Sequence, residues 1–443
     1  MHNSAMTKSM QRIRILFIIP SFRTGGAEVQ LLSLVRGLDK SRFDVTVAAF
    51  YKGGELDADF KSCPGVDIVF LQKRNGLDFG FLQRLLSIVR FKDIQIIQSY
   101  NVSARLFGVL TARLARKPIA IATERTARLL YSSKGSRAFL FLEKYALRSA
   151  DRVVANSTAG KKFAELRGVA PTKSMVIYNG IDAQRIKINR SAKEVRQSLN
   201  IPASAFVVGM AARIEPLKDP KMLVEAARHV FQFADDIYFL LVGDGPMLSE
   251  IQDAIKSLEL QARFIFAGHR TDSIDFLNAM DVVVLTSNKI EGCSNSLLES
   301  MWLGKAVVAT RVGGNVELIE HEKSGLLISP KNPDELSASI LRLHDDAEFK
   351  DRLAQNGRLN VQQRFSQSKM VDEHERLYEE LLAAKERTGQ KKSVQQNSLD
   401  FGRPFARSMI LGCPVDQMTL DQCVGYFKDV IENPAYGYAL ATN

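Results

Sequence analysis

Short apolar runs alternate with amphipathic segments through most of this 443-residue sequence. The run from Ile13 to Ile19 is continuously apolar, which is typical of a strand buried on both faces of a sheet. The segment that follows has apolar residues at the spacing of a helix, at Val29, Leu31, Leu32, Val35 and Leu38. Repeated strand–helix units of this kind predict α/β domains with parallel, doubly wound sheets.

The strand-like runs form two series, which predicts two domains. The first series is expected at 13–19, 45–49, 66–71, 94–98, 119–123, 153–154 and 175–178. The second is expected at 206–211, 237–242, 263–267, 282–286, 306–310 and 325–328. Residues 181–202 are polar and poor in strand signal, so we expect a first domain over 12–190 and a second over 203–364.

The last part of the chain differs in composition. Residues 387–403 are rich in Lys, Gln and Ser with almost no apolar content, which predicts a linker. Apolar residues return over 404–443, with an amphipathic helix expected at 419–431. Because about 40 residues cannot bury a sufficient core, this segment is expected to pack on the main body or to begin a larger module.

Charge and cysteine content narrow the possible partners. Sixty Lys and Arg against 49 Asp and Glu give a net charge of +11, which favours anionic partners. Nucleic acid is not expected, because no helix-turn-helix, zinc-finger or RNA-binding signature is present. Contact of the basic first half with an anionic membrane and a merely solvated basic surface explain the charge equally well. The four scattered cysteines predict neither disulfides nor a zinc site.

The sequence also gives an expectation about location. No apolar run reaches the ~18 residues that a membrane-spanning helix needs. The first ten residues contain no apolar core of the kind found in signal peptides. We therefore expect a cytoplasmic protein, with peripheral contact to the inner face of the cytoplasmic membrane as an option.

The stretch from Glu291 to Gly304 holds two glutamates eight residues apart, in a polar loop that opens a predicted helix. The loop follows a strand, and the carboxyl ends of parallel strands are where open α/β sheets bind ligands. Backbone N–H groups at a helix start near Ser294 would suit a diphosphate. Glu299, about one turn into the helix, can accept hydrogen bonds from ribose hydroxyls, and Glu291 lies nearer to the position of a sugar.

A structural alternative explains Glu299 equally well. Ser296-Leu297-Leu298-Glu299 matches a capping box, in which Glu299 only satisfies the start of its own helix.

Three other loops carry candidate ligands at strand ends. Arg213 and Lys218 follow the first strand of the second series, where two cations would neutralise a leaving diphosphate without a metal. Gly243-Asp244 and Gly25-Gly26 follow other strands, and glycines there would let the backbone approach a ligand. Each loop alone is weak evidence. Four of them on corresponding strand ends favour a nucleotide-sugar site in a cleft between two sheets.

These motifs occur in a fixed order: Gly25-Gly26-Ala27-Glu28, Asn179-Gly180-Ile181-Asp182, Arg213 with Lys218-Asp219, Gly243-Asp244-Gly245, Glu291 to Glu299, and Gly313-Gly314 with Glu317. In order, spacing and residue type the chain resembles the family 4 glycosyltransferases over residues 12–385. Those are retaining nucleotide-sugar enzymes of the GT-B fold, in which two Rossmann-like domains face each other across a cleft.

The resemblance implies roles for individual residues. Arg213 and Lys218 would bind the donor diphosphate, Glu299 the ribose and Glu291 the transferred sugar. The remaining donor-binding positions would be Gly25, Gly26, Gly243, Asp244, Ser294, Asn295, Ser296 and Leu297, with backbone amides around 294–297 meeting the phosphates. The last helix, 367–385, would cross back onto the first domain. No metal or cofactor is expected beside the donor.

One departure from the family concerns a histidine. Many members carry it at the ends of the middle strands of the first domain, where this chain has Gln98 to Asn101 and Thr123 to Arg125. Acceptor binding is therefore an open question, and Glu124, Arg125 and Asn101 are the candidate replacements.

The C-terminal segment resembles the opening of the family 26 glycosyltransferases, which act on polyprenyl-diphosphate sugars. The similarity rests on Ile410 to Asp416, Thr419 and the closing Ala441-Thr442-Asn443. It implies an active-site role for Thr442, although no activity is expected from so short a segment. Together with the charge, it makes a polyprenyl-diphosphate-linked glycan of bacterial surface polysaccharide synthesis the preferred acceptor.

Two features look functional but are better explained by structure. Asp57-Ala58-Asp59 matches an Asp-x-Asp metal motif, yet it is expected in a surface helix and not at a strand end. Cys293 lies beside Glu291 but has no histidine near it in sequence, so packing is the expected role.

Two other functions remain open at this point. A nucleotide-sugar epimerase or phosphorylase of related two-domain fold would act on the donor without a glycan acceptor. A non-catalytic subunit that binds donor or lipid would show no donor turnover that depends on Glu291 or Lys218.

Overall fold

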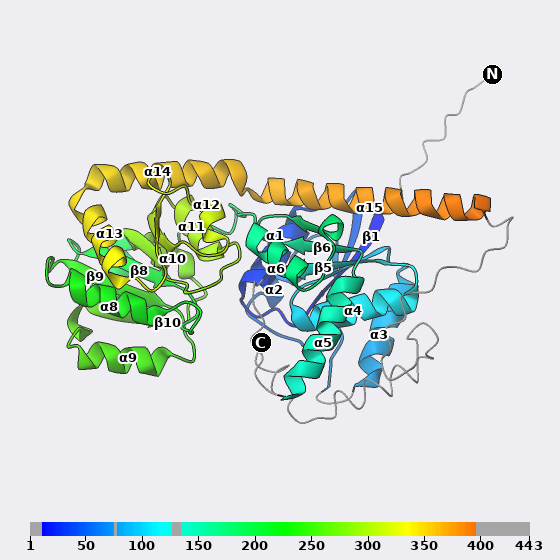
Figure 1. The fold of residues 1–443 in the computed structure, drawn as a ribbon, viewed down its shortest axis with the longest axis horizontal. Coiled ribbons are helices and arrows are strands. Elements are labelled where there is room, and N and C mark those ends of the chain that lie inside the picture. Colours follow the sequence, from blue (N-terminus) through cyan, green and yellow to red (C-terminus); the bar gives the residue numbers. More distant parts are fainter. Residues whose placement is uncertain (1–10, 75–77, 126–133, 396–443) are drawn as a thin grey trace, which may run out of the picture.

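The computed structural model describes residues 11–74, 78–125 and 134–395. Two parallel sheets, each with helices on both faces, lie beside one another in this part of the chain (Figure 1). The two α/β domains with parallel, doubly wound sheets predicted from the sequence are confirmed.

The first sheet has the strand order β3-β2-β1-β4-β5-β6-β7. Its strands are β1 (Ile13–Ile19), β2 (Phe43–Ala49), β3 (Val66–Phe70), β4 (Ile96–Ser99), β5 (Ile119–Glu124), β6 (Arg152–Ala155) and β7 (Ser174–Val176). Its helices are α1 (Gly26–Gly37), α2 (Asp57–Lys61), α3 (Phe79–Phe91), α4 (Val102–Ala115), α5 (Lys134–Ser149) and α6 (Thr158–Leu166), with a short 3-10 turn at Pro171–Lys173.

The second sheet has the order β10-β9-β8-β11-β12-β13. Its strands are β8 (Phe206–Ala211), β9 (Ile237–Val242), β10 (Phe264–Gly268), β11 (Val282–Leu285), β12 (Ala306–Thr310) and β13 (Leu326–Ile328). Its helices are α7 (Ala192–Ser198), α8 (Pro220–Val230), α9 (Leu248–Ser257), α10 (Ser273–Asn278), α11 (Asn295–Trp302), α12 (Asn315–Leu318), α13 (Pro333–Asp345) and α14 (Ala347–Arg364), with a 3-10 turn at Gln261–Arg263. In both sheets the winding direction reverses next to the first strand, which creates a crevice suited to ligands.

The core of the first domain follows from the two-residue period of its strands. In β1, Ile15, Phe17 and Ile19 face one layer of helices, and Leu16 and Ile18 face the other. All five side chains are fully buried. The continuous apolar run therefore fills two separate cores, as a central parallel strand must.

The last helix, α15 (Gln367–Gln395), crosses from the second domain onto the first (Figure 1). At the crossing, Ile181 forms a bridge with Ser366. Beyond it, Tyr378 donates a 2.6 Å hydrogen bond to Gln98 at the end of β4, and Glu375 pairs with Arg42 at 2.6 Å. Helix α15 thus ties the two domains together along one side.

Two boundaries differ from those predicted. Helix α15 continues to Gln395, past the linker start predicted at 387, because Lys, Glu, Gln and Arg sustain a helix as well as they compose a linker. Residues 192–198 of the predicted inter-domain segment form α7, which starts with a capping box between Ser191 and Glu194 and buries Val195 in the second domain. The predicted module at 404–443 lies outside the described residues.

None of the helices in the described ranges is long and apolar enough to cross a membrane.

Candidate active site

Lys218 and Glu291 meet at the crevice of the second sheet. The Lys218 ammonium lies 2.5 Å from Glu291 Oε2, and the Ser287 hydroxyl donates to the same oxygen at 2.6 Å. Both charged side chains are largely buried, with 18% and 13% of their surfaces exposed. The pair can therefore offer both a hydrogen-bond acceptor and a hydrogen-bond donor to a ligand.

The end of β11 holds the Lys218 loop in place. The Thr286 hydroxyl donates to the carbonyl oxygens of Lys218 and Asp219, at 2.6 and 3.0 Å. Asp219 has a left-handed backbone (φ 45°) just before Pro220 starts α8. This loop geometry turns the lysine toward the neighbouring strand and therefore toward Glu291.

Arg213, the other predicted cation, does not join this pair. It follows β8 on the same loop, but its side chain is 58% exposed and its ion pair is with Glu215 at 3.7 Å. Of the two predicted diphosphate ligands, only Lys218 is oriented against Glu291 in this structure.

Helix α11 starts at the predicted place but with a different cap. The Ser294 hydroxyl accepts a hydrogen bond from the Leu297 N–H, so Ser294 is the N-cap. Ser296 and Glu299 are then two and five positions into the helix counted from the cap, and the capping box predicted as the alternative is absent. Glu299 is not needed to satisfy its own helix start, and burial raises its pKa to about 7.

Asn295, the first residue of α11, contacts the first domain. Its Oδ1 accepts from Gln30 at 3.1 Å and from Asn179 at 2.7 Å, and its Nδ2 donates to the Gly26 carbonyl at 3.2 Å. Gln30 in turn bonds both the N–H and the carbonyl of Gly180. The starts of α1 and α11 are therefore fixed against each other by a network that the sequence patterns did not reveal.

Several glycines of the predicted site serve contacts between loops. A Cβ on Gly243 would lie 2.0 Å from the Ala212 carbonyl, and Gly243 has φ +144°. A Cβ on Gly313 would lie 2.1 Å from the Glu291 carbonyl. Asp244 bonds its own neighbour, the Gly245 N–H, at 2.6 Å. Gly243 lets the loop after β9 pack against the loop after β8, and Gly313 lets the loop after β12 pack against the backbone of Glu291.

In the first domain, Glu28 lies in the first turn of α1. A Cβ on Gly25 would lie 2.4 Å from Glu28 Oε2, so the missing side chain of Gly25 leaves room for this carboxylate. Asn101 donates to Glu28 Oε1 at 2.9 Å. Burial raises the Glu28 pKa, opposed by a hydrogen bond from its own backbone N–H, by the Asn101 hydrogen bond and by the Arg125 charge.

The three candidate replacements for the family's histidine separate clearly. Glu124 is 2% exposed and pairs with Arg105 at 2.9 Å, inside the helix layer of the first domain. It is therefore removed from the cleft. Asn101 contacts Glu28, and the Arg125 guanidinium lies over the Tyr100 ring at 5.4 Å and donates to Asn179.

A second bridge between the domains involves Glu317. Its carboxylate accepts from the Thr158 N–H at 2.9 Å and the Ala159 N–H at 3.3 Å, at the start of α6. The Tyr178 hydroxyl donates to it at 2.8 Å. Glu317, which follows Gly313-Gly314, therefore connects the second domain to the first.

The residues of the Asp-x-Asp motif make ion pairs, and Cys293 is packed inside the second domain. Asp57 pairs with Lys61 and Asp59 with Arg36, both within or beside α2. Cys293 is buried, and burial raises the pKa of its thiol to about 12. Among the residues that the structure describes, no group of three or more His, Cys, Asp or Glu side chains is arranged to hold a metal.

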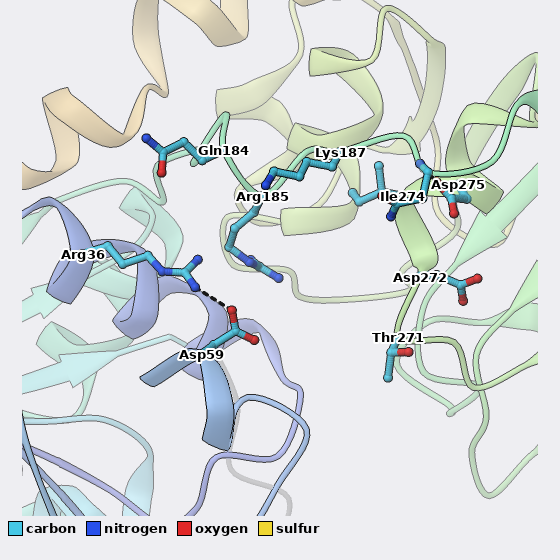
Figure 2. A pocket seen from close by; sticks show the side chains of 10 residues that line it. Arg36, Asp59, Gln184, Arg185, Lys187, Thr271, Asp272, Ile274 and Asp275 are labelled. Carbon is cyan, nitrogen blue, oxygen red and sulfur yellow. Dashed lines mark hydrogen bonds and ion pairs between the residues drawn. The ribbon is translucent and has the colours of Figure 1, made fainter. Parts of the chain in front are cut away.

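A polar pocket of about 280 Å³ lies between the domains (Figure 2). Its lining comes from the first domain, the connecting segment and the loop into α10: Arg36, Asp59, Gln184, Arg185, Lys187, Asn189, Thr271, Asp272, Ile274 and Asp275. The charge of Arg185 also opposes the raised pKa of Glu299.

Two family models match the chain. The model described as Glycosyltransferase Family 4 matches residues 24–185, and the one described as Glycosyl transferases group 1 matches residues 191–360. The division between them falls at the start of α7, as the packing of this helix indicates.

Similar proteins include characterised transferases. An Escherichia coli UDP-Gal:alpha-D-GlcNAc-diphosphoundecaprenol alpha-1,3-galactosyltransferase is 25% identical, over 81% of this chain and 97% of that protein. A lipopolysaccharide core biosynthesis glycosyltransferase of Rhizobium meliloti is 31% identical, over 42% and 53%. The Anabaena Alr3699/HepE structure with UDP and glucose is 25% identical with a TM-score of 0.73, over 83% of this chain and all of that one.

Proposed function

Because this chain is a glycosyltransferase of the GT-B fold and the family 4 type, we propose that it transfers a hexose from a UDP-hexose with retention of anomeric configuration. The observation that carries this proposal is the Lys218–Glu291 pair beside the start of α11. The acceptor we propose is a polyprenyl-diphosphate-linked saccharide of bacterial surface polysaccharide synthesis.

The donor diphosphate would lie between Lys218 and the first N–H groups of α11. When the bond between the anomeric carbon and the phosphate oxygen breaks, negative charge grows on the departing UDP. A lysine and a helix start stabilise such charge without a metal ion. Arg213, on the same loop, would exchange its ion pair with Glu215 for the diphosphate when the donor binds.

The two glutamates would bind different parts of the donor. Glu299, one turn into α11, would accept hydrogen bonds from the ribose hydroxyls. Glu291 would face the hexose, with its carboxylate oriented by Lys218 and Ser287. UDP as the nucleotide is supported by the UDP complexes of the Anabaena protein and by the donor named for the Escherichia coli relative.

The acceptor and the location rest on different observations. The Escherichia coli relative acts on a diphosphoundecaprenol-linked sugar, and this chain carries a net charge of +11. Both support an acceptor presented at an anionic membrane, where basic side chains of the first domain would approach the lipid headgroups. The cytoplasmic side is the location that we propose.

A ligand screen tests the donor assignment. Thermal unfolding would be followed with UDP, GDP, ADP and CDP and with their hexose conjugates. A ligand at 100 times its dissociation constant adds ~2.7 kcal/mol of apparent stability. We expect the largest shift with UDP and UDP-hexoses, and no requirement for added divalent cations; a larger shift with another nucleotide would refute the donor assignment.

A further inference from the structure

The carboxylate of Glu28 is not accounted for by any donor role assigned so far. It belongs to the first turn of α1, where the missing Cβ of Gly25 gives it space. A negative charge at this helix start is unsuited to a phosphate and well suited to hydroxyl groups. The first turn of α1 therefore offers a different chemistry from the start of α11.

Asn101 is held in an unusual backbone conformation to reach this carboxylate. Its backbone angles are φ 71° and ψ 161°, a region that residues other than glycine rarely occupy. It occupies the N-cap position of α4, yet its side chain makes no capping hydrogen bond and donates instead to Glu28 Oε1 at 2.9 Å. Strain of this kind is kept where the surrounding structure needs a particular orientation.

Three observations connect the surroundings of Glu28 to the start of α11 and to the loop that carries Glu291. The Gly26 carbonyl, in the same helix turn, accepts from Asn295 at the start of α11. Arg125, whose charge acts on Glu28, is linked through Asn179 to the Cys293 carbonyl. A Cβ on Gly292 would lie 2.9 Å from the Arg125 carbonyl, which places the Arg125 backbone against the residue next to Glu291.

We propose that Glu28, oriented by Asn101, is a sugar-binding carboxylate on the first domain's side of the cleft, facing the hexose opposite Glu291. This inference rests on the proposed transfer of a hexose. The ligand is a sugar hydroxyl, which can belong to the transferred hexose or to the acceptor saccharide. Asn101 is a positioning residue, because it acts through Glu28.

The test compares the wild-type chain with Glu28→Gln and Glu28→Ala. Glutamine keeps the size of the side chain and can still accept from Asn101, but it is a weaker partner for hydroxyls. We expect the affinity for UDP to stay within about twofold, and kcat/KM for transfer to fall at least tenfold in Glu28→Gln and further in Glu28→Ala.

Two arms identify the source of the hydroxyl. If it belongs to the transferred hexose, the affinity gained by UDP-hexose over UDP shrinks in the variants. If it belongs to the acceptor, that gain persists and the acceptor KM rises. Asn101→Ala should change the same quantity as the Glu28 variants, either the affinity gained by UDP-hexose or the acceptor KM, but by a smaller factor. A general loss of stability would not change one of these quantities selectively.

Glu55→Gln is the matched control. Glu55 is an exposed carboxylate that accepts from the Thr24 N–H at 2.7 Å, beside the same loop, and it has no part in the proposed sugar contact. We expect wild-type transfer from this variant. An unchanged kcat/KM for transfer in Glu28→Ala would overturn this inference and leave the proposed function standing. A loss of UDP affinity as large as the loss of kcat/KM would do the same. A wild-type chain that consumes no UDP-hexose would instead refute the proposed function.

Discussion

The Lys218 ammonium and a Glu291 carboxylate oxygen lie 2.5 Å apart, although the two residues are 73 positions apart in the chain. The pair exists because the β8 and β11 strands are neighbours in the sheet and the Thr286 hydroxyl holds the lysine loop. It joins the cation expected to meet a leaving diphosphate to the acid expected to face the sugar.

Replacing Lys218 by alanine should lower kcat for transfer by at least about 100-fold, since one well-placed group of this kind contributes ~2.7–4 kcal/mol to transition-state stabilisation. The measurement is initial-rate UDP release from UDP-hexose with saturating acceptor. Lys221→Ala is the control, because Lys221 lies on the same segment but is exposed and pairs with Glu250. Equal rates in the two variants would contradict a catalytic Lys218.

Affinity for UDP should fall as the pH is lowered from about 8 to about 6. Burial raises the pKa of Glu299 to about 7, so its carboxyl becomes protonated over this range and accepts ribose hydroxyls less well. Titration calorimetry at several pH values measures this. In Glu299→Gln the affinity should be weaker at pH 8 and nearly independent of pH; a wild-type profile that is flat would count against the ribose role.

The same group should affect the stability of the ligand-free chain. The folded pKa of Glu299 lies above its usual value of 4.5, so the folded chain keeps a proton that the unfolded chain has lost. Its contribution becomes more unfavourable as the pH rises from about 4.5 to about 7. Glu299→Gln should therefore raise the melting temperature more at pH 8 than at pH 5, and the reverse order would contradict the burial of this carboxyl.

Asn295→Ala should destabilise the fold by about 2 kcal/mol, because it leaves the buried Gln30 and Asn179 side chains without a shared partner. Urea unfolding measures the change. Asn356→Ala, which removes one exposed hydrogen bond to the Lys323 carbonyl, should cost much less. Similar costs would mean that the bridge between α1 and α11 contributes little.

Arg105→Ala should cost about 3–5 kcal/mol, because it leaves Glu124 and Glu143 buried with less compensation. Arg113→Ala on the same helix removes a half-exposed pair with Asp151 and should cost about 1 kcal/mol or less.

The acceptor KM should be unchanged in Glu124→Gln. A raised acceptor KM in that variant would return Glu124 to the list of histidine replacements.

Much of the fold could be read from the sequence, because buried parallel strands leave continuous apolar runs. The bounds of β1, β8, β9 and β12 were predicted to the residue. The end of α15 was not, since its polar composition is compatible with both a helix and a linker.

The candidate site was predictable only as far as local patterns reach. Glycines and charges at strand ends identified the loops, and periodicity placed Glu299 on a helix. Whether Ser294 or Ser296 caps α11 depends on one hydroxyl contact. The burial of Glu124 against Arg105 and the hydrogen bond between Asn295 and Gln30 join segments that are far apart in the chain. The spacing of residues in the sequence cannot predict such contacts.

The most direct test of the account is the anomeric configuration of the product, read by NMR. Purified wild-type chain would be incubated with a UDP-α-hexose and a polyprenyl-diphosphate-linked saccharide. The account predicts an α-linked sugar on the acceptor, with one UDP released for each sugar transferred. A β-linked product, or UDP-hexose left intact in the presence of acceptor, would contradict it.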